Sequence, residues 1–195
     1  EHETRALVYV YREGLLQKEL ENPENAPDYE HMLVLSVTPE KAPDQRTELS
    51  IDWKKGKPVG LNGRKMSLRE ILTELNRIGG ANGIGITDIV ENRVVGMKSR
   101  GVYETPGGTI LIEAHKQLEE LILDRQTMEF KELADVKFAQ TVYEGKWFAP
   151  LREALEAFVS STQKYVSGRT KLALYKGNII RAGVSSPYSL YNESL

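Results

Sequence analysis

The stretch TELSIDWKKGKPVGLNG, residues 47–63, contains the clearest strand pattern of the sequence. Leu49, Ile51 and Trp53 alternate with polar residues, which is the two-residue period of a strand with one buried face. KKGKP then turns the chain, and VGLNG ends in Asn62-Gly63, a dipeptide that suits the positive φ angles of a tight hairpin turn. We therefore predict a β-hairpin or meander over residues 47–65.

Helical patterns follow this meander. In SLREILTELNRIGG, residues 67–80, Ser67 and Glu70 form a capping box at the helix start, and we expect Gly79-Gly80 to stop the helix. Three further amphipathic helices are predicted over residues 106–123, 130–144 and 150–166, the last with its apolar side chains facing a core.

The remaining strands are shorter. HMLVLSV, residues 31–37, and ITDIV, residues 86–90, each predict one strand, and TKLALYKGNIIRAGV, residues 170–184, predicts two strands joined at Lys176-Gly177-Asn178. Strands and helices are thus segregated rather than alternating. The predicted class is α+β, with a mainly antiparallel sheet packed with about four helices.

Composition excludes several classes of protein. The 195 residues carry 26 Lys and Arg against 28 Asp and Glu, so the broad basic field that nucleic-acid binding needs is missing. Without cysteine there is no disulfide, thiolate zinc site or cysteine nucleophile. No apolar run is long enough to span a bilayer, and the charged start does not resemble a signal peptide. We expect a cytoplasmic protein that binds neither nucleic acid nor membrane.

Several residue types with catalytic potential are interpreted structurally. The three histidines are scattered, and His115 is expected to be a partly exposed helical residue rather than a base. Trp53 and Trp147 are expected in the core rather than in a ligand platform. No phosphate-binding glycine loop is present, so we predict no nucleotide site, no metal site and no catalytic residue within this chain.

One segment, DIVENRVVGMKSRGVYETPGG at residues 88–108, is too rich in charge and glycine to be ordinary core. Carboxylates, guanidinium groups and a tyrosine so close together suit recognition of a small zwitterion, because carboxylates accept hydrogen bonds from nitrogen donors. The alternative is a surface hairpin whose opposite charges pair across the strands. Composition alone leaves both interpretations open.

The order of residues adds a resemblance. VENRVVGMKSRGVYETPGGTIL, residues 90–111, resembles the argininosuccinate synthase family, and so do GKPVGLNG at 56–63, LNRIGGANGIG at 75–85, FAQTVYEGKWFAPLREAL at 138–155 and SPYSLYNESL at the end. The resemblance runs from about residue 19 to residue 195. It implies the family's C-terminal synthetase and oligomerisation domain over residues 19–195, preceded by an altered or non-native segment over residues 1–18.

The resemblance also implies a reaction. In this family ATP, citrulline and aspartate give AMP, pyrophosphate and argininosuccinate, a carbon-nitrogen ligation of arginine biosynthesis and the urea cycle. The family's ATP-binding loop belongs to an N-terminal domain that nothing in this sequence matches. We therefore expect ATP and Mg to bind mainly to that domain, supplied by another chain or missing, and the present chain alone to be inactive.

Two family contacts to citrulline map onto this sequence. The glutamate of VENR is Glu91, expected to accept a hydrogen bond from a citrulline nitrogen, the α-ammonium. The tyrosine of GVYETP is Tyr103, expected to form a hydrogen bond with a polar group of the same ligand. The alternatives are a packed Tyr103 and a Glu91 that pairs with Arg93 or Arg100. Arg93, Lys98 and Arg100 are interpreted as charges that stabilise the fold or contact another domain.

Two departures from the family pattern remain. The family also uses serines just before the LENP segment for citrulline, and residues 5–19, RALVYVYREGLLQKE, contain none. Family members continue beyond SLYNESL into an arm used in their tetramer, so a homo-oligomer is implied but expected to be weakened here. A stand-alone citrulline-binding or assembly module without catalysis is the alternative function.

Overall fold

A computed structural model describes residues 22–191 of the chain. The segment 1–18 interpreted above as altered lies outside the described residues. The described residues divide into two compact units: one contains residues 22–48, 69–113 and 172–180, and the other contains residues 49–68, 114–171 and 181–191. Each unit is described by itself.

The larger sheet has five strands in the order β3-β2-β1-β6-β7. These strands are β1 (Thr47–Lys54), β2 (Lys57–Leu61), β3 (Arg64–Lys65), β6 (Gly168–Tyr175) and β7 (Asn178–Ser185). The pairs β1–β2 and β2–β3 are antiparallel, and Asn62 and Gly63 join β2 to β3 with φ angles of 51° and 76°. The predicted meander and the predicted 170–184 hairpin are therefore confirmed, as is the α+β class.

The core side of β1 follows the predicted alternation. Leu49, Ile51 and Trp53 are buried while the residues between them are not. The Trp53 indole donates a hydrogen bond of 2.9 Å to Thr170 Oγ1 on β6, which satisfies its only donor in the core. Burial of one face and a satisfied indole explain why this strand forms where the sequence predicts it.

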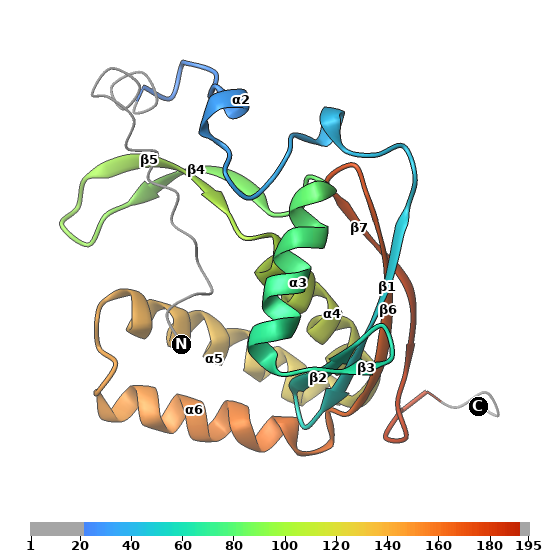
Figure 1. The fold of residues 1–195 in the computed structure, drawn as a ribbon. Helices are drawn as coiled ribbons and strands as arrows, with labels where there is room; N and C mark the ends of the chain where they lie inside the picture. Colours follow the sequence, from blue (N-terminus) through green and yellow to red (C-terminus); the bar gives the residue numbers. More distant parts are fainter. Residues whose placement is uncertain (1–21, 192–195) are drawn as a thin grey trace. The chain divides into compact units, whose positions relative to one another are not determined.

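In the order of the chain, the helices alternate with groups of strands (Figure 1). They are α2 (Tyr29–Met32), α3 (Leu68–Ala81), α4 (Pro106–Ile122), α5 (Arg125–Tyr143) and α6 (Pro150–Thr162), with short 3₁₀ turns η1 (Pro39–Lys41) and η2 (Gln163–Tyr165). The Asp124 side chain caps α5 by accepting from Thr127 N at 3.0 Å. This cap explains why α5 begins before residue 130, the start that apolar spacing predicts.

The predicted strand at residues 31–37 is wrong. His31 and Met32 end the short helix α2, and the following backbone is irregular. Its N–H groups are satisfied by a side chain instead of a strand partner: those of Val34, Leu35 and Ser36 donate to the Glu104 carboxylate at 2.8, 3.0 and 2.7 Å. A carboxylate can accept several hydrogen bonds at once, so the N–H groups of residues 34–36 need no partner strand. This apolar segment therefore does not join a sheet.

The predicted helix end at Gly79-Gly80 is confirmed to within one residue, because α3 ends at Ala81. Both glycines are buried, and a Cβ on Gly80 would lie 1.9 Å from the carbonyl oxygen of Leu35. On Gly79 it would lie 2.8 Å from the Ile110 side chain. The glycines therefore permit close packing inside the helix, and Gly83, with φ of 71°, follows its end.

Two burial predictions fail in the helical hairpin of α5 and α6, which lie side by side (Figure 1). Trp147 is 47% exposed, with the Arg152 guanidinium 5.0 Å from its ring centre, so it is not a core residue. Helix α6 contributes no fully buried residue, because only part of its apolar face is covered by α5. A cavity of about 300 Å³ between the two helices is lined by Asp135, Phe138, Ala139, Glu156, Val159 and Ser160.

Candidate functional site

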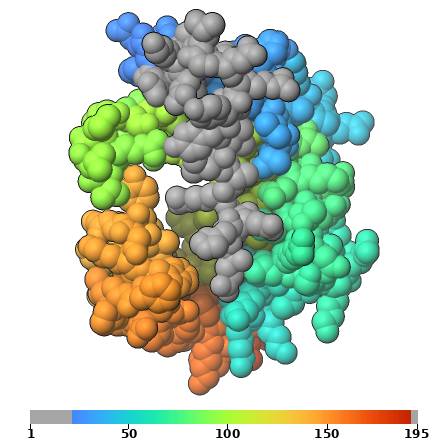
Figure 2. Space-filling view, turned by 60° about the vertical axis from the view of Figure 1, so that its left-hand side comes forward, coloured from blue at the N-terminus to red at the C-terminus, as the bar shows by residue number. Residues whose placement is uncertain are grey.

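The motif-rich segment folds as a separate two-stranded hairpin of β4 (Ile86–Asn92) and β5 (Lys98–Glu104). The strands are antiparallel, with Glu91 opposite Ser99 and Thr87 opposite Tyr103. Directly opposed residues share a face of the hairpin, so Glu91 and Tyr103 point to the same side. Figure 2 shows the hairpin, in green, at the molecular surface.

The structure brings the two predicted citrulline residues together. The Tyr103 hydroxyl donates a hydrogen bond of 2.5 Å to Glu91 Oε1. The Glu91 side chain is 20% exposed, so the carboxylate is partly shielded but reachable. A contact of either side chain with citrulline stays a prediction.

The three basic residues of the motif differ in their surroundings. Arg93 NH1 lies 3.7 Å from Glu91 Oε1, and its NH2 donates to Ser99 Oγ at 3.0 Å. Lys98 lies exposed at the start of β5. The alternative in which Glu91 pairs with Arg93 thus describes a real contact, which coexists with the Tyr103 bond.

Arg100 lies on the opposite face of the hairpin and pairs with Asp88, not with Glu91. Its Nε and NH2 donate to the two Asp88 oxygens at 2.8 and 2.7 Å, and NH1 donates to the carbonyls of Asn22 and Asn25. The hydrogen bonds from Arg100 lower the pKa of Asp88, although desolvation opposes the shift. Arg100 therefore stabilises the hairpin and its attachment to residues 22–25.

Sequence reasoning missed Glu104, the last residue of β5. Its side chain is 1% exposed and accepts the three N–H groups of residues 34–36 described above. The only signal was its position in the motif directly after Tyr103. Glu104 fixes the end of the strand that presents Tyr103.

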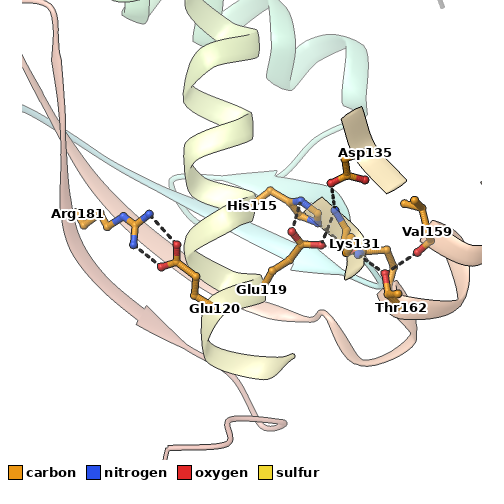
Figure 3. A network of polar contacts seen from close by, with 9 residues as sticks. His115, Glu119, Glu120, Lys131, Asp135, Val159, Thr162 and Arg181 are labelled. Atoms are coloured by element: carbon orange, nitrogen blue, oxygen red, sulfur yellow. Dashed lines mark hydrogen bonds and ion pairs between the residues drawn. The ribbon is translucent and has the colours of Figure 1, made fainter. Parts of the chain in front are cut away.

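His115 is a partly exposed helical residue, as predicted, in a network on α4, α5 and η2 (Figure 3). Its Nε2 lies 2.8 Å from Gln163 Oε1, and Nδ1 lies 3.7 Å from the Glu119 carboxylate. Lys131 lies between Glu119, at 3.4 Å, and Asp135. All members of this network have protein partners, so it is interpreted as structural.

Within residues 22–191 no group of three or more His, Cys, Asp or Glu side chains is arranged to hold a metal ion. None of the helices in this range is both long and apolar enough to cross a membrane. The hairpin face with Glu91 and Tyr103 is the candidate site, because the two motif residues meet there in a hydrogen bond.

Nearly the whole chain matches proteins of one family. The model of the arginosuccinate synthase C-terminal domain matches residues 11–195. The argininosuccinate synthases of Agathobacter rectalis and Lachnoclostridium phytofermentans are 64% and 65% identical over 191 residues. That of Desulforamulus reducens is 61% identical over 191 residues. The chain belongs to the argininosuccinate synthase family.

The matches also show how much of the family's chain is present. They cover 98% of this chain but only 46% of the Agathobacter rectalis and Lachnoclostridium phytofermentans proteins. The chain thus spans about half the length of its relatives and corresponds to their C-terminal part.

Proposed function

We propose that this chain is the synthetase part of an argininosuccinate synthase and contributes the hairpin that binds citrulline. Family membership supports the reaction, in which ATP, citrulline and aspartate give AMP, pyrophosphate and argininosuccinate. The observation that carries the citrulline assignment is the 2.5 Å hydrogen bond between Tyr103 and Glu91. Both residues occupy the family's citrulline positions, and they lie on one exposed hairpin face.

The direction of the hydrogen bond between Tyr103 and Glu91 indicates which group of a ligand the pair can bind. Tyr103 donates its single proton to Glu91, so its oxygen accepts any further hydrogen bond, and Glu91 is also an acceptor. A pair of acceptors with a negative charge fits an ammonium group and not a carboxylate. We therefore assign it to the α-ammonium of citrulline.

Positioning is the contribution of this hairpin to the chemistry. In the proposed reaction the ureido oxygen of citrulline attacks the α-phosphate of ATP, and the aspartate amine then displaces AMP from the citrullyl-AMP intermediate. Holding citrulline by its ammonium end restricts where the ureido oxygen lies, which reduces the entropy cost of bringing the reactants together. Neither Glu91 nor Tyr103 needs to exchange a proton with the reacting atoms.

The partners of this function are an ATP-binding part and further copies of the chain. We propose that ATP and its Mg bind mainly to the part that precedes the matched region in the relatives, which this chain does not cover. A homo-oligomer and a cytoplasmic location complete the proposal. The N-terminal part of the Agathobacter rectalis relative is a suitable test partner, because its C-terminal part is 64% identical to this chain.

The experiment is a calorimetric titration of citrulline into this chain mixed with that N-terminal part. Glu91→Gln and Tyr103→Phe should each weaken binding by about ten- to a hundredfold, since each removes a hydrogen bond to a charged group. Glu48→Gln and Tyr191→Phe, both at exposed positions, are matched controls and should bind like the unmodified chain.

Equal affinity in all five proteins would refute the site assignment. Citrulline binding without AMP formation, even in the mixture, would instead support the alternative of a non-catalytic binding module.

A further inference from the structure

The Tyr103 side chain must span a long distance along the hairpin to contact Glu91. Tyr103 lies opposite Thr87, and Glu91 is four residues further along the same strand as Thr87. At about 3.4 Å per residue, about 14 Å separate the two positions along the strands. Their side chains can form the 2.5 Å hydrogen bond only if the tyrosine extends along the hairpin instead of standing upright on it.

Gly101 lies under the tyrosine ring. It is opposite Ile89, between the Thr87–Tyr103 pair and the Glu91–Ser99 pair, and therefore on the same face. A Cβ on Gly101 would lie 2.7 Å from Tyr103 Cε2 and 2.9 Å from the hydroxyl oxygen. Non-bonded carbon atoms prefer about 3.5–4.0 Å, so any other residue would displace the ring.

The need for glycine at this position is steric. Gly101 is not among the glycines with positive φ, so its backbone conformation suits other residues too. The three atoms nearest to a Cβ at this position all belong to one neighbour, Tyr103. Glycine at position 101 therefore leaves free the space in which the Tyr103 ring lies.

Arg93 also contacts the Glu91 side chain. It contacts the same carboxylate oxygen that accepts the Tyr103 proton, and Ser99 Oγ accepts from its second terminal nitrogen. The Glu91 carboxylate is thus held between a hydroxyl and a guanidinium that is itself anchored across the hairpin.

We propose that Gly101 and Arg93 are positioning residues of the ammonium-binding pair: Gly101 provides the slot in which Tyr103 lies, and Arg93 orients the Glu91 carboxylate. This inference rests on the proposed citrulline-binding function. Together the two residues preorganise the acceptors before the ligand binds, which reduces the ordering cost of binding.

The geometric part is tested on this chain alone by NMR. Tyrosine labelled with ¹³C at Cζ gives one signal per residue, and Tyr103→Phe identifies the signal of Tyr103. Glu91→Gln should shift that signal, because it changes the acceptor of the hydroxyl. Gly101→Ala should produce a comparable shift, whereas Val90→Ala, at an exposed position on the other face, should leave the signal unchanged.

The ligand part is tested by citrulline titration in the mixture with the N-terminal part. Gly101→Ala should weaken binding about tenfold or more, and it should cause no further loss in a Tyr103→Ala background, because the ring it displaces is gone. Arg93→Gln should raise the KM for citrulline severalfold with kcat nearly unchanged, and Arg93→Lys should restore part of the loss. The arginine variants provide the test if Gly101→Ala does not fold.

The outcomes separate the two proposals. An unshifted Tyr103 signal in Gly101→Ala would overturn the proposal that Gly101 provides the slot for the tyrosine. Weaker binding in Tyr103→Phe but not in Gly101→Ala would uphold the citrulline site and overturn the role of Gly101. A shifted signal with unchanged citrulline affinity in both variants would overturn the proposed function and the positioning role with it.

Discussion

At the scale of residues, carboxylates with defined partners organise the part of the chain that contains the candidate site. Glu104 accepts three backbone N–H groups, Asp88 accepts a paired donation from Arg100, and Glu91 accepts the Tyr103 proton. Glu91 differs from the other two in lying on the same hairpin face as Tyr103, where we propose that citrulline binds.

Replacing Glu104 tests its role in folding. Glu104→Gln keeps the shape but loses the charge and turns an NH₂ group toward backbone donors. Leaving buried N–H groups unsatisfied costs about 1–3 kcal/mol, so the free energy of unfolding should fall by about that amount in a urea titration. Glu48→Gln, at an exposed position, is the control, and an equal stability of both variants would refute this role.

The Asp88–Arg100 pair predicts a pH dependence. The pKa of Asp88 is lowered from its ordinary value of 3.8 by the hydrogen bonds from Arg100, so the folded chain holds the ionised form more strongly than the unfolded chain does. Its stabilising contribution is therefore complete above about pH 4 and is lost as the pH falls below that value.

The measurement is the unfolding free energy between pH 6 and pH 3. Asp88→Asn should be less stable than the unmodified chain at pH 6 and should lose less stability on acidification. Asp44→Asn removes an exposed carboxylate whose ion pair with Lys176 contributes little in solvent, so this variant should follow the unmodified chain. Parallel curves for the unmodified chain and Asp88→Asn would contradict the prediction.

At the scale of elements, the sequence predicts regular strands and helices well where one buried face sets the period. The alternation in β1, the spacing in α4 and the turn residues after β2 and β6 all give the observed elements. Prediction fails where a distant side chain or close packing decides: the N–H groups of residues 34–36 find Glu104, and Gly80 meets Leu35.

The candidate site, too, could be predicted from the sequence only in part. The family motif identifies Glu91 and Tyr103, but it does not show that they bond to each other or that a Cβ at Gly101 would meet the tyrosine ring. Those relations depend on strand register, and a register is set by pairing with residues outside the local pattern.

Gly80→Ala tests the packing interpretation of α3. In an exposed helix this change stabilises by about 1 kcal/mol, because alanine is the better helix former. In α3 the new Cβ would meet the Leu35 carbonyl, so we expect a loss of about 1–3 kcal/mol from overpacking, measured by thermal or urea unfolding. Thr73→Ala, on the exposed side of the same helix, should be neutral or stabilising. A stabilised Gly80→Ala would show that the contact is easily relieved.

At the scale of the whole molecule, the chain corresponds to less than half of its relatives' length. We predict that it forms no argininosuccinate from ATP, citrulline and aspartate by itself. Adding the N-terminal part of the Agathobacter rectalis relative should produce AMP and pyrophosphate release that depends on both amino acids. The control is the N-terminal part alone, and turnover by the present chain alone would contradict the prediction.

The order of the strands in the large sheet has a consequence for folding kinetics. β1, β2 and β3 join neighbours a few residues apart, and such hairpins form within microseconds. The pairing of β1 with β6 instead joins residues as far apart as Trp53 and Thr170, 117 positions along the chain. Because contacts this remote form slowly, the Trp53 indole reports a late step, and its fluorescence should change after the meander has formed.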